Sequence, residues 1–184
     1  RRMALRERLS GKGYYAGIMT NRPSDTPPGY LSSPEAEAGA QLVGMHDMPL
    51  LGSGMLGWFA TTQCDLPDHL FLKPNPIHAL GLMQMCFGEP IKKALHLAYD
   101  LWRGLGDRKD WEKFDQTTVV VFEDAVKGFD AGKCAKRLLV QKHIEIDLRL
   151  IGISKSPIKE AALERVADQT FSDINHIDWD RLLN

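Results

Sequence analysis

The sequence predicts an α/β protein with a doubly wound, mostly parallel sheet that carries helices on both faces. Short apolar runs, which are typical of buried strands, alternate along the chain with segments of helical spacing. The clearest strand is TTVVVF, residues 117–122, a continuous β-branched run of the kind expected for a central parallel strand covered on both faces. A chain of 184 residues, 43% of them hydrophobic, is long and apolar enough for one domain with its own core.

The first half of the chain is expected to alternate helices with short strands. Leu5 and Leu9 lie one turn apart in a charged helical pattern. Ser33, Pro34 and Glu35 combine a capping hydroxyl, a proline at the first helical position and an acidic first turn, which indicates a helix start. We expect helices over 1–9, from 33 onward, over 76–87 and 91–103, strands over 14–19, 58–63 and 70–72, and a loop over 23–33.

The second half is expected to continue this alternation. The charged segment 104–116 is predicted to lie at the surface. After the strand at 117–122 we expect a helix over 128–140, a strand over 148–153, a helix over 158–167, a short strand at 170–171 and a closing helical turn over 179–183. Helices between successive strands are what a parallel sheet requires, because each parallel strand needs a crossover to reach the next.

Composition excludes several classes of partner. The net charge of −1 offers no basic surface for nucleic acid or for an anionic membrane. No apolar run is long enough to span a bilayer, and no signal peptide is visible. The three cysteines, Cys64, Cys86 and Cys134, are scattered and form no CxxC pair, which favours a reducing compartment over a zinc site or a disulfide framework. We therefore expect a cytoplasmic protein that binds neither nucleic acid nor membrane.

Polar residues follow three of the expected strands. Thr20 and Asn21 follow the first, Lys73 follows the run at 70–72, and Glu123 and Asp124 follow TTVVVF. Ligands of parallel sheets bind beyond the carboxyl ends of the strands. Carboxylates suit Mg²⁺, a lysine can neutralise a phosphoryl group, and a hydroxyl and an amide can hold phosphate oxygens. Taken singly, each also has an ordinary explanation: a helix cap, an exposed lysine and a turn.

Taken in order, three segments resemble motifs II, III and IV of the haloacid dehalogenase (HAD) superfamily. They are GIMTNRPS at 17–24, LKPNP at 72–76 and VVVFEDAVKGFDAGKCA at 119–135. The resemblance implies that Thr20 binds the transferring phosphoryl group, with Asn21 beside it, and that Lys73 stabilises the nucleophile and the aspartyl-phosphate intermediate. It implies that Asp124 ligates Mg²⁺ with the help of Glu123. Gly128 would then allow a close turn into the helix that follows.

The same resemblance implies a Mg²⁺-dependent phosphatase or phosphomutase that acts on a small phosphorylated metabolite. HAD phosphatases attack phosphorus with an aspartate of a DxD motif at the end of their first strand, while Mg²⁺ shields the charge. No DxD motif precedes Thr20. We therefore expect residues 1–184 to be one HAD-like core domain that is N-terminally incomplete, lacks its nucleophile and is not active as it stands.

A second departure from the family pattern lies between Lys73 and Glu123. This span of about 50 residues is longer than in compact members, so we expect a helical insertion at about 88–116, in which Trp102 and Trp111 provide an apolar face. Two alternatives stay open. One is a non-catalytic HAD-like binding or structural protein. The other is an unrelated doubly wound domain of the nucleotide-binding or receiver type, although the chain has no GxxxxGKS/T or GxGxxG run and no aspartate at the end of an early strand.

Overall fold

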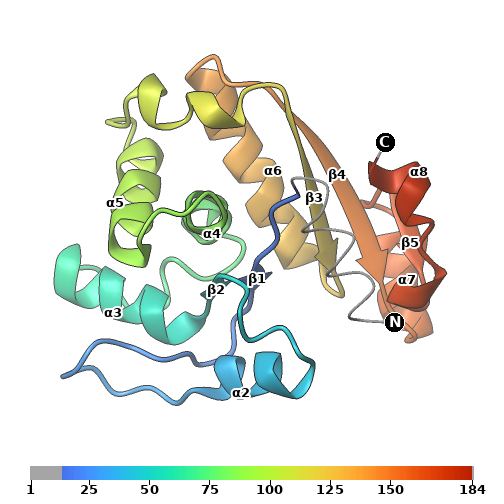
Figure 1. Ribbon diagram of the computed structural model, residues 1–184, viewed down its shortest axis with the longest axis horizontal. Helices are drawn as coiled ribbons and strands as arrows, with labels where there is room; N and C mark the ends of the chain where they lie inside the picture. Colours follow the sequence, from blue (N-terminus) through green and yellow to red (C-terminus); the bar gives the residue numbers. More distant parts are fainter. Residues whose placement is uncertain (1–13, 184) are drawn as a thin grey trace. The chain divides into compact units, whose positions relative to one another are not determined.

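The computed structural model describes residues 14–183, and it confirms an α/β protein with two small parallel sheets (Figure 1). The chain divides into two compact units, Arg1–Gly106 and Asp107–Asn184, and each is described by itself. The helix expected over 1–9 lies outside the described residues. None of the helices among residues 14–183 is both long enough and apolar enough to cross a membrane.

The first unit is a two-stranded parallel sheet packed with helices. Its strands pair Ile18 with Leu50 and Met19 with Leu51. The expected strand over 14–19 is thus shorter than predicted, since only its last two residues enter the sheet. The elements in order are β1 (Ile18–Met19), α2 (Glu35–Leu42), β2 (Leu50–Leu51), α3 (Ser53–Gln63), α4 (Pro76–Cys86) and α5 (Ile91–Trp102).

Helices α4 and α5 confirm the predictions over 76–87 and 91–103. The Asn75 side chain caps α4 by accepting a hydrogen bond from the Ile77 N–H at 2.9 Å, and proline occupies the first helical position. A β-carbon at Gly81 would lie 3.1 Å from the Leu95 side chain and 3.2 Å from Leu51. A residue without a side chain therefore lets α4 pack closely against both α5 and β2.

Two strand predictions in this unit, over 58–63 and 70–72, are wrong. Residues 58–63 belong to α3, whose buried residues include Leu56, Trp58 and Phe59. A short helix that is buried on most sides has no polar face, so its sequence cannot be told from a buried strand by periodicity. Residues 70–72 form consecutive turns in which the Leu70 N–H bonds to Pro67 and the Leu72 N–H to His69. The apolar character of this run reflects Phe71, which is fully buried.

The start of α2 also differs from the prediction. Pro34 is the N-cap residue itself, and no side chain caps the helix. The Ser33 hydroxyl instead donates to the Glu35 carboxylate at 3.3 Å. The expected acidic first turn is present, with Glu35 and Glu37, and it is favourable beside the positive end of the helix dipole.

The second unit is built on a three-stranded parallel sheet of order β3-β4-β5. Thr117 pairs with Ile146, and this register continues to Glu123 and Gly152. The predictions for residues 117–183 are confirmed as to element type, with shifted ends. The elements are η1 (Arg108–Asp110), η2 (Glu112–Phe114), β3 (Thr117–Glu123), α6 (Val126–Gln141), β4 (Ile146–Ile153), α7 (Pro157–Leu163), β5 (Gln169–Phe171), η3 (Ile174–His176) and α8 (Trp179–Leu183).

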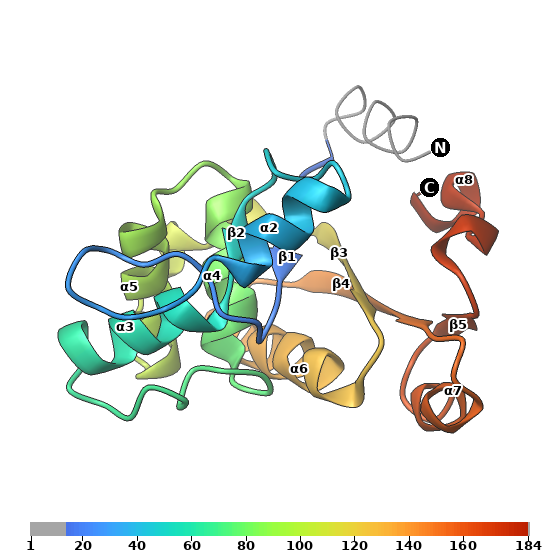
Figure 2. The same cartoon turned by 90° about the horizontal axis from the view of Figure 1, so that it is seen from below.

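Helices cover both faces of this three-stranded sheet (Figure 2). On one face Phe129 of α6 packs with Leu150 of β4 and Leu163 of α7. On the other face Ile151 packs with Ile177 and with Leu182 of α8. Neighbouring residues of β4 therefore point into different cores, as successive side chains of a strand must. Among the described residues β3 pairs with β4 alone, so the central position expected for TTVVVF is not seen within this unit.

The segment 88–116, expected to be a helical insertion, is divided between the two units. Its first part is α5, in which Ala98 and Leu101 are buried. Its second part holds the turns η1 and η2, where Trp111 and Phe114 are almost completely buried. Trp111 and Phe114 thus belong to a core and not to the surface predicted for 104–116. That this segment is an insertion stays a prediction.

Candidate functional site

Thr20 and Asn21 follow β1 directly, as predicted. The Thr20 N–H donates to the Leu51 carbonyl at 3.1 Å and so continues the pairing of β1 with β2 by one residue. The Thr20 hydroxyl oxygen accepts a hydrogen bond from the Arg22 N–H at 3.1 Å. The chain turns away from the sheet at this point, which leaves the Thr20 and Asn21 side chains at the carboxyl edge of β1.

Lys73 reaches the same edge from a distant part of the chain. Its N–H donates to the Asn21 side-chain oxygen at 3.3 Å, and its ammonium group donates to the Met19 carbonyl at 3.1 Å. The Lys73–Pro74 peptide bond is cis. The structure therefore brings together three of the predicted site residues: Thr20, Asn21 and Lys73.

His78 is a residue of this cluster that the sequence analysis missed. It is fully buried in α4, and its Nε2 lies 2.8 Å from the Leu51 carbonyl oxygen. Because a carbonyl only accepts, Nε2 carries the proton. Burial lowers the pKa of His78 to about 4; the hydrogen bond to Leu51 opposes this, and the nearby charge of Lys73 adds to it. The imidazole is therefore neutral near pH 7.

No metal-ligand spacing marked His78, and a lone histidine is usually a packing residue. The position of His78 in the sequence could have indicated that it belongs to this cluster. His78 lies five residues after Lys73, on the first turn of a helix, and this helical turn brings it back toward the end of the sheet. Its Nδ1 is buried and has no hydrogen-bond partner. Such an atom is unusual in a native core, because an unsatisfied buried polar group costs about 1–3 kcal/mol.

Glu123 and Asp124 lie in the second unit, at the carboxyl end of β3, as predicted. The Asp124 carboxylate forms an exposed ion pair with Lys159 of α7, with Oδ2 2.6 Å from Nζ. The Glu123 side chain folds back over α6, where a β-carbon at Gly128 would overlap its carboxyl group. The absence of a side chain at Gly128 therefore makes room for Glu123, whereas the role expected for it, a close turn into the helix, stays a prediction.

These two carboxylates are the residues that could hold Mg²⁺. Among residues 14–183 no group of three or more His, Cys, Asp or Glu side chains is arranged around a common metal position. Mg²⁺ does not require such a cage, because it is commonly held by one or two carboxylates and completes its shell with water and substrate phosphate. The contact of Asp124 with an ammonium group shows that this carboxylate accepts a cation partner. The donor chemistry of the pair therefore fits Mg²⁺.

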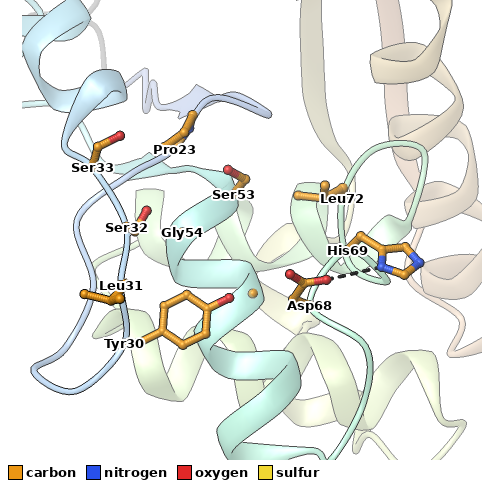
Figure 3. Close-up of a pocket in the computed structure, with 11 residues that line it drawn as sticks. Pro23, Tyr30, Leu31, Ser32, Ser33, Ser53, Gly54, Asp68, His69 and Leu72 are labelled. Carbon is orange, nitrogen blue, oxygen red and sulfur yellow. Dashed lines mark hydrogen bonds and ion pairs between the residues drawn. The ribbon is translucent and has the colours of Figure 1, made fainter.

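An open pocket of about 350 Å³, lined by both polar and apolar residues, lies in the first unit (Figure 3). The loop after β1, the beginning of α3 and the turns before Lys73 form its walls. It could not be predicted from the sequence, because these three segments are separated along the chain. Its lining residues are Pro23, Tyr30, Leu31, Ser32, Ser33, Ser53, Gly54, Gly57, Asp68, His69 and Leu72.

Comparison with known proteins identifies no relative. A scan against protein-family models, a search of curated proteins and a search of solved structures each found no match to this chain. The resemblance to the HAD superfamily consequently depends on the three sequence motifs. Within the first unit, the contacts of Lys73 with Asn21 and Met19 are evidence about chemistry that stands independently of that resemblance.

Proposed function

We propose that this chain is the phosphate- and magnesium-handling part of a HAD-type phosphoryl-transfer hydrolase. The enzyme would be a phosphatase or phosphomutase that acts on a small phosphorylated metabolite. The finer fold assignment, a doubly wound HAD-like core without its nucleophile-bearing strand, is part of the same proposal. The observation that carries it is the meeting of Lys73 with Asn21 and Met19 at the end of β1, beside Thr20.

This cluster has the chemistry that a phosphoryl group requires. The Thr20 hydroxyl and the Asn21 amide supply hydrogen-bond donors, and the Lys73 ammonium group supplies a positive charge. Charge-assisted hydrogen bonds of this kind are about twice as strong as neutral ones. The parallel pairing of β1 with β2 supports the location, because ligands of parallel sheets bind beyond the carboxyl ends of the strands.

The carboxylates of Glu123 and Asp124 would hold the metal. When bound there, Mg²⁺ would shield the negative charge of the phosphoryl group during attack by a nucleophile. In the HAD superfamily the phosphate ligands and the metal ligands serve the same phosphoryl group. The proposal therefore predicts that the protein binds both inorganic phosphate and Mg²⁺, each through its own set of residues.

Binding tests this proposal more directly than turnover does, because no DxD motif precedes Thr20. Isothermal titrations of the 184-residue protein with inorganic phosphate and, separately, with Mg²⁺ should each show binding. Lys73→Ala should weaken phosphate binding about tenfold or more, the loss expected for one charge-assisted contact. Asp124→Asn should weaken Mg²⁺ binding.

Lys93→Ala is the matched control, since it removes the same charge from the first unit at an exposed lysine that pairs with Glu89. Phosphate binding that is equally strong in wild type, Lys73→Ala and Lys93→Ala would contradict the role given to Lys73. Mg²⁺ binding that is unchanged in Asp124→Asn would contradict the metal site. Absence of both ligands would favour a non-catalytic or unrelated doubly wound protein.

A further inference from the structure

The pocket of Figure 3 is built by segments that follow both strands of the first unit. The loop after β1 and the helix after β2 both contribute to it, so it stands beyond the carboxyl ends of both parallel strands. Leu72 of the lining is the residue before Lys73, and Pro23 follows Arg22, whose N–H bonds to the Thr20 hydroxyl. Residues that line the pocket are thus close neighbours in sequence of the proposed phosphate ligands Thr20 and Lys73.

The wall formed by the loop is held in place by hydrogen bonds. The Ser53 N–H donates to the Arg22 carbonyl at 2.9 Å, and the Met55 N–H donates to the buried Ser24 hydroxyl at 3.1 Å. Farther along, the Thr26 hydroxyl donates to the Tyr30 carbonyl at 2.9 Å. The loop is therefore anchored to the first turn of α3, and the pocket is largely formed before any ligand binds, which lowers the entropic cost of binding.

Two glycines of α3 bring the loop close to the helix. A β-carbon at Gly54 would overlap the Ser32 hydroxyl, and one at Gly57 would lie 2.5 Å from the Tyr30 hydroxyl. Any side chain at these positions would displace the residues that line the pocket. The close approach of the Ser32 and Tyr30 hydroxyl groups to α3 thus depends on glycine at both positions.

The Tyr30 hydroxyl and the Asp68 carboxylate both line the pocket, but no hydrogen bond of the described residues joins them. Burial and the charge of Asp68 both raise the pKa of Tyr30. The Asp68 carboxylate contacts His69 Nδ1 at 3.2 Å. Figure 3 shows the Tyr30 hydroxyl pointing toward the side of the pocket where Asp68 lies. A ligand group that both donates and accepts could bridge the two.

We propose that this pocket binds a polyhydroxylated leaving group, so that the substrate is a sugar phosphate or a polyol phosphate. The proposal rests on the proposed phosphate site at Thr20 and Lys73. Ligand hydroxyls would donate to the Asp68 carboxylate, which only accepts, and would exchange hydrogen bonds with the hydroxyls of Tyr30, Ser32 and Ser53. The charge of Asp68 disfavours a leaving group that carries a carboxylate of its own, such as that of phosphoglycolate.

Isothermal titration of the 184-residue protein with three probes tests this: inorganic phosphate, glucose 6-phosphate and phosphoglycolate. We expect glucose 6-phosphate to bind about tenfold more tightly than inorganic phosphate, the gain from one or two additional hydrogen bonds. Phosphoglycolate should bind no more tightly than inorganic phosphate. Asp68→Ala should remove the advantage of glucose 6-phosphate and leave the affinity for inorganic phosphate unchanged, and Tyr30→Phe should reduce that advantage.

Asp25→Ala is the matched control, because Asp25 is an exposed aspartate of the same unit that does not line the pocket. The Asp68 side chain is 65% exposed, so its replacement should leave the fold intact, which circular dichroism would verify. Equal binding of inorganic phosphate and glucose 6-phosphate, or an undiminished advantage in Asp68→Ala, would overturn the pocket assignment and leave the phosphate site standing. Failure of all three probes to bind would overturn both.

Discussion

The imidazole Nε2 of His78 lies 2.8 Å from the carbonyl oxygen of Leu51. The same oxygen accepts the N–H of Thr20 at 3.1 Å, so a single carbonyl joins the end of β2 to both α4 and the residue that follows β1. His78 is thereby placed to orient the backbone of the proposed phosphate site, although it does not itself belong to the phosphate ligands. Its burial and its low pKa make it sensitive to acid.

The first prediction concerns stability in acid. The pKa of His78 is about 4 in the folded protein, below the ordinary value of 6.5, because burial disfavours the charged form. The unfolded state therefore binds more protons between these values, and stability is lost as the pH falls from about 6.5 toward 4. The loss should reach roughly 3 kcal/mol. Urea unfolding of wild type and His78→Gln at several pH values measures it.

Only the difference between these two proteins isolates the contribution of His78, because carboxylates also titrate near pH 4. His69→Gln is the control, since His69 is an exposed histidine of the same unit, with 76% of its side chain accessible. The dependence of stability on pH should change more in His78→Gln than in His69→Gln. A His78→Gln protein that loses as much stability as wild type between pH 6.5 and 4 would show that His78 does not remain neutral.

The second prediction concerns the hydrogen bond that His78 donates. His78→Leu removes the donor to Leu51, whereas His78→Gln can keep a side-chain N–H in a similar position. We expect faster hydrogen exchange of the Thr20 amide and weaker phosphate binding in the leucine variant, with recovery of both in the glutamine variant. If the leucine variant is less stable but keeps the wild-type exchange rate of the Thr20 amide, His78 stabilises the core and does not orient the backbone at Thr20.

The third prediction concerns Gly128. In Gly128→Ala the new β-carbon would occupy the position of the Glu123 carboxyl group, which is the mobile end of a flexible side chain. We expect the carboxyl group to move, so that Mg²⁺ binds several-fold more weakly. Stability should change by less than about 1 kcal/mol, because alanine favours a helix over glycine by a similar amount. Calorimetric titration with Mg²⁺ measures the first effect and thermal unfolding the second.

Gly132→Ala is the matched control in the same helix. A β-carbon there would lie 3.4 Å from the Val121 side chain and 3.7 Å from Leu148, which are ordinary contacts. Its Mg²⁺ affinity should equal that of wild type. If both alanine variants bind Mg²⁺ as wild type does, the position of Glu123 is unimportant for the metal.

The fourth prediction concerns Lys159, whose ammonium group lies 2.6 Å from the Asp124 carboxylate. A metal ion at Asp124 must compete with this charge, so Lys159→Met should raise the affinity for Mg²⁺ several-fold. Stability should change little, because both side chains are more than half exposed and such pairs contribute at most about 1 kcal/mol. Lys155→Met is the control, since Lys155 pairs with Asp173 instead. Equal gains in the two variants would mean a general charge effect.

Sequence periodicity anticipated most of the second unit and less of the first. Strand β3 and helix α6 were predictable because a β-branched run and an amphipathic helix each carry their own pattern. Helix α3 was not, because its buried residues surround it and leave no polar face to reveal its period. The run at 70–72 is apolar because Phe71 enters an aromatic cluster with Phe59 and Tyr99, and not because it forms a strand.

The proposed site also has a part that could be predicted from the sequence and a part that could not. Thr20, Asn21, Lys73, Glu123 and Asp124 could be named from the sequence, because each stands directly after a recognisable apolar run or inside a motif. The contact of Lys73 with Asn21 and Met19, the buried bond of His78 and the pocket around Tyr30 and Asp68 could not. They join residues tens of positions apart, and such distances are set by packing.

By itself, the sequence determined the α/β class, the order of most elements and the residue types available for phosphate and Mg²⁺. Local patterns suffice for these properties, since they depend on side-chain spacing and on neighbouring residues. Only the tertiary structure decided that Leu51 serves both His78 and Thr20, that Lys159 neutralises Asp124, and that glycines 54 and 57 bring a loop against α3. These depend on close approach of distant segments, which burial of apolar surface drives without leaving a local signal in the chain.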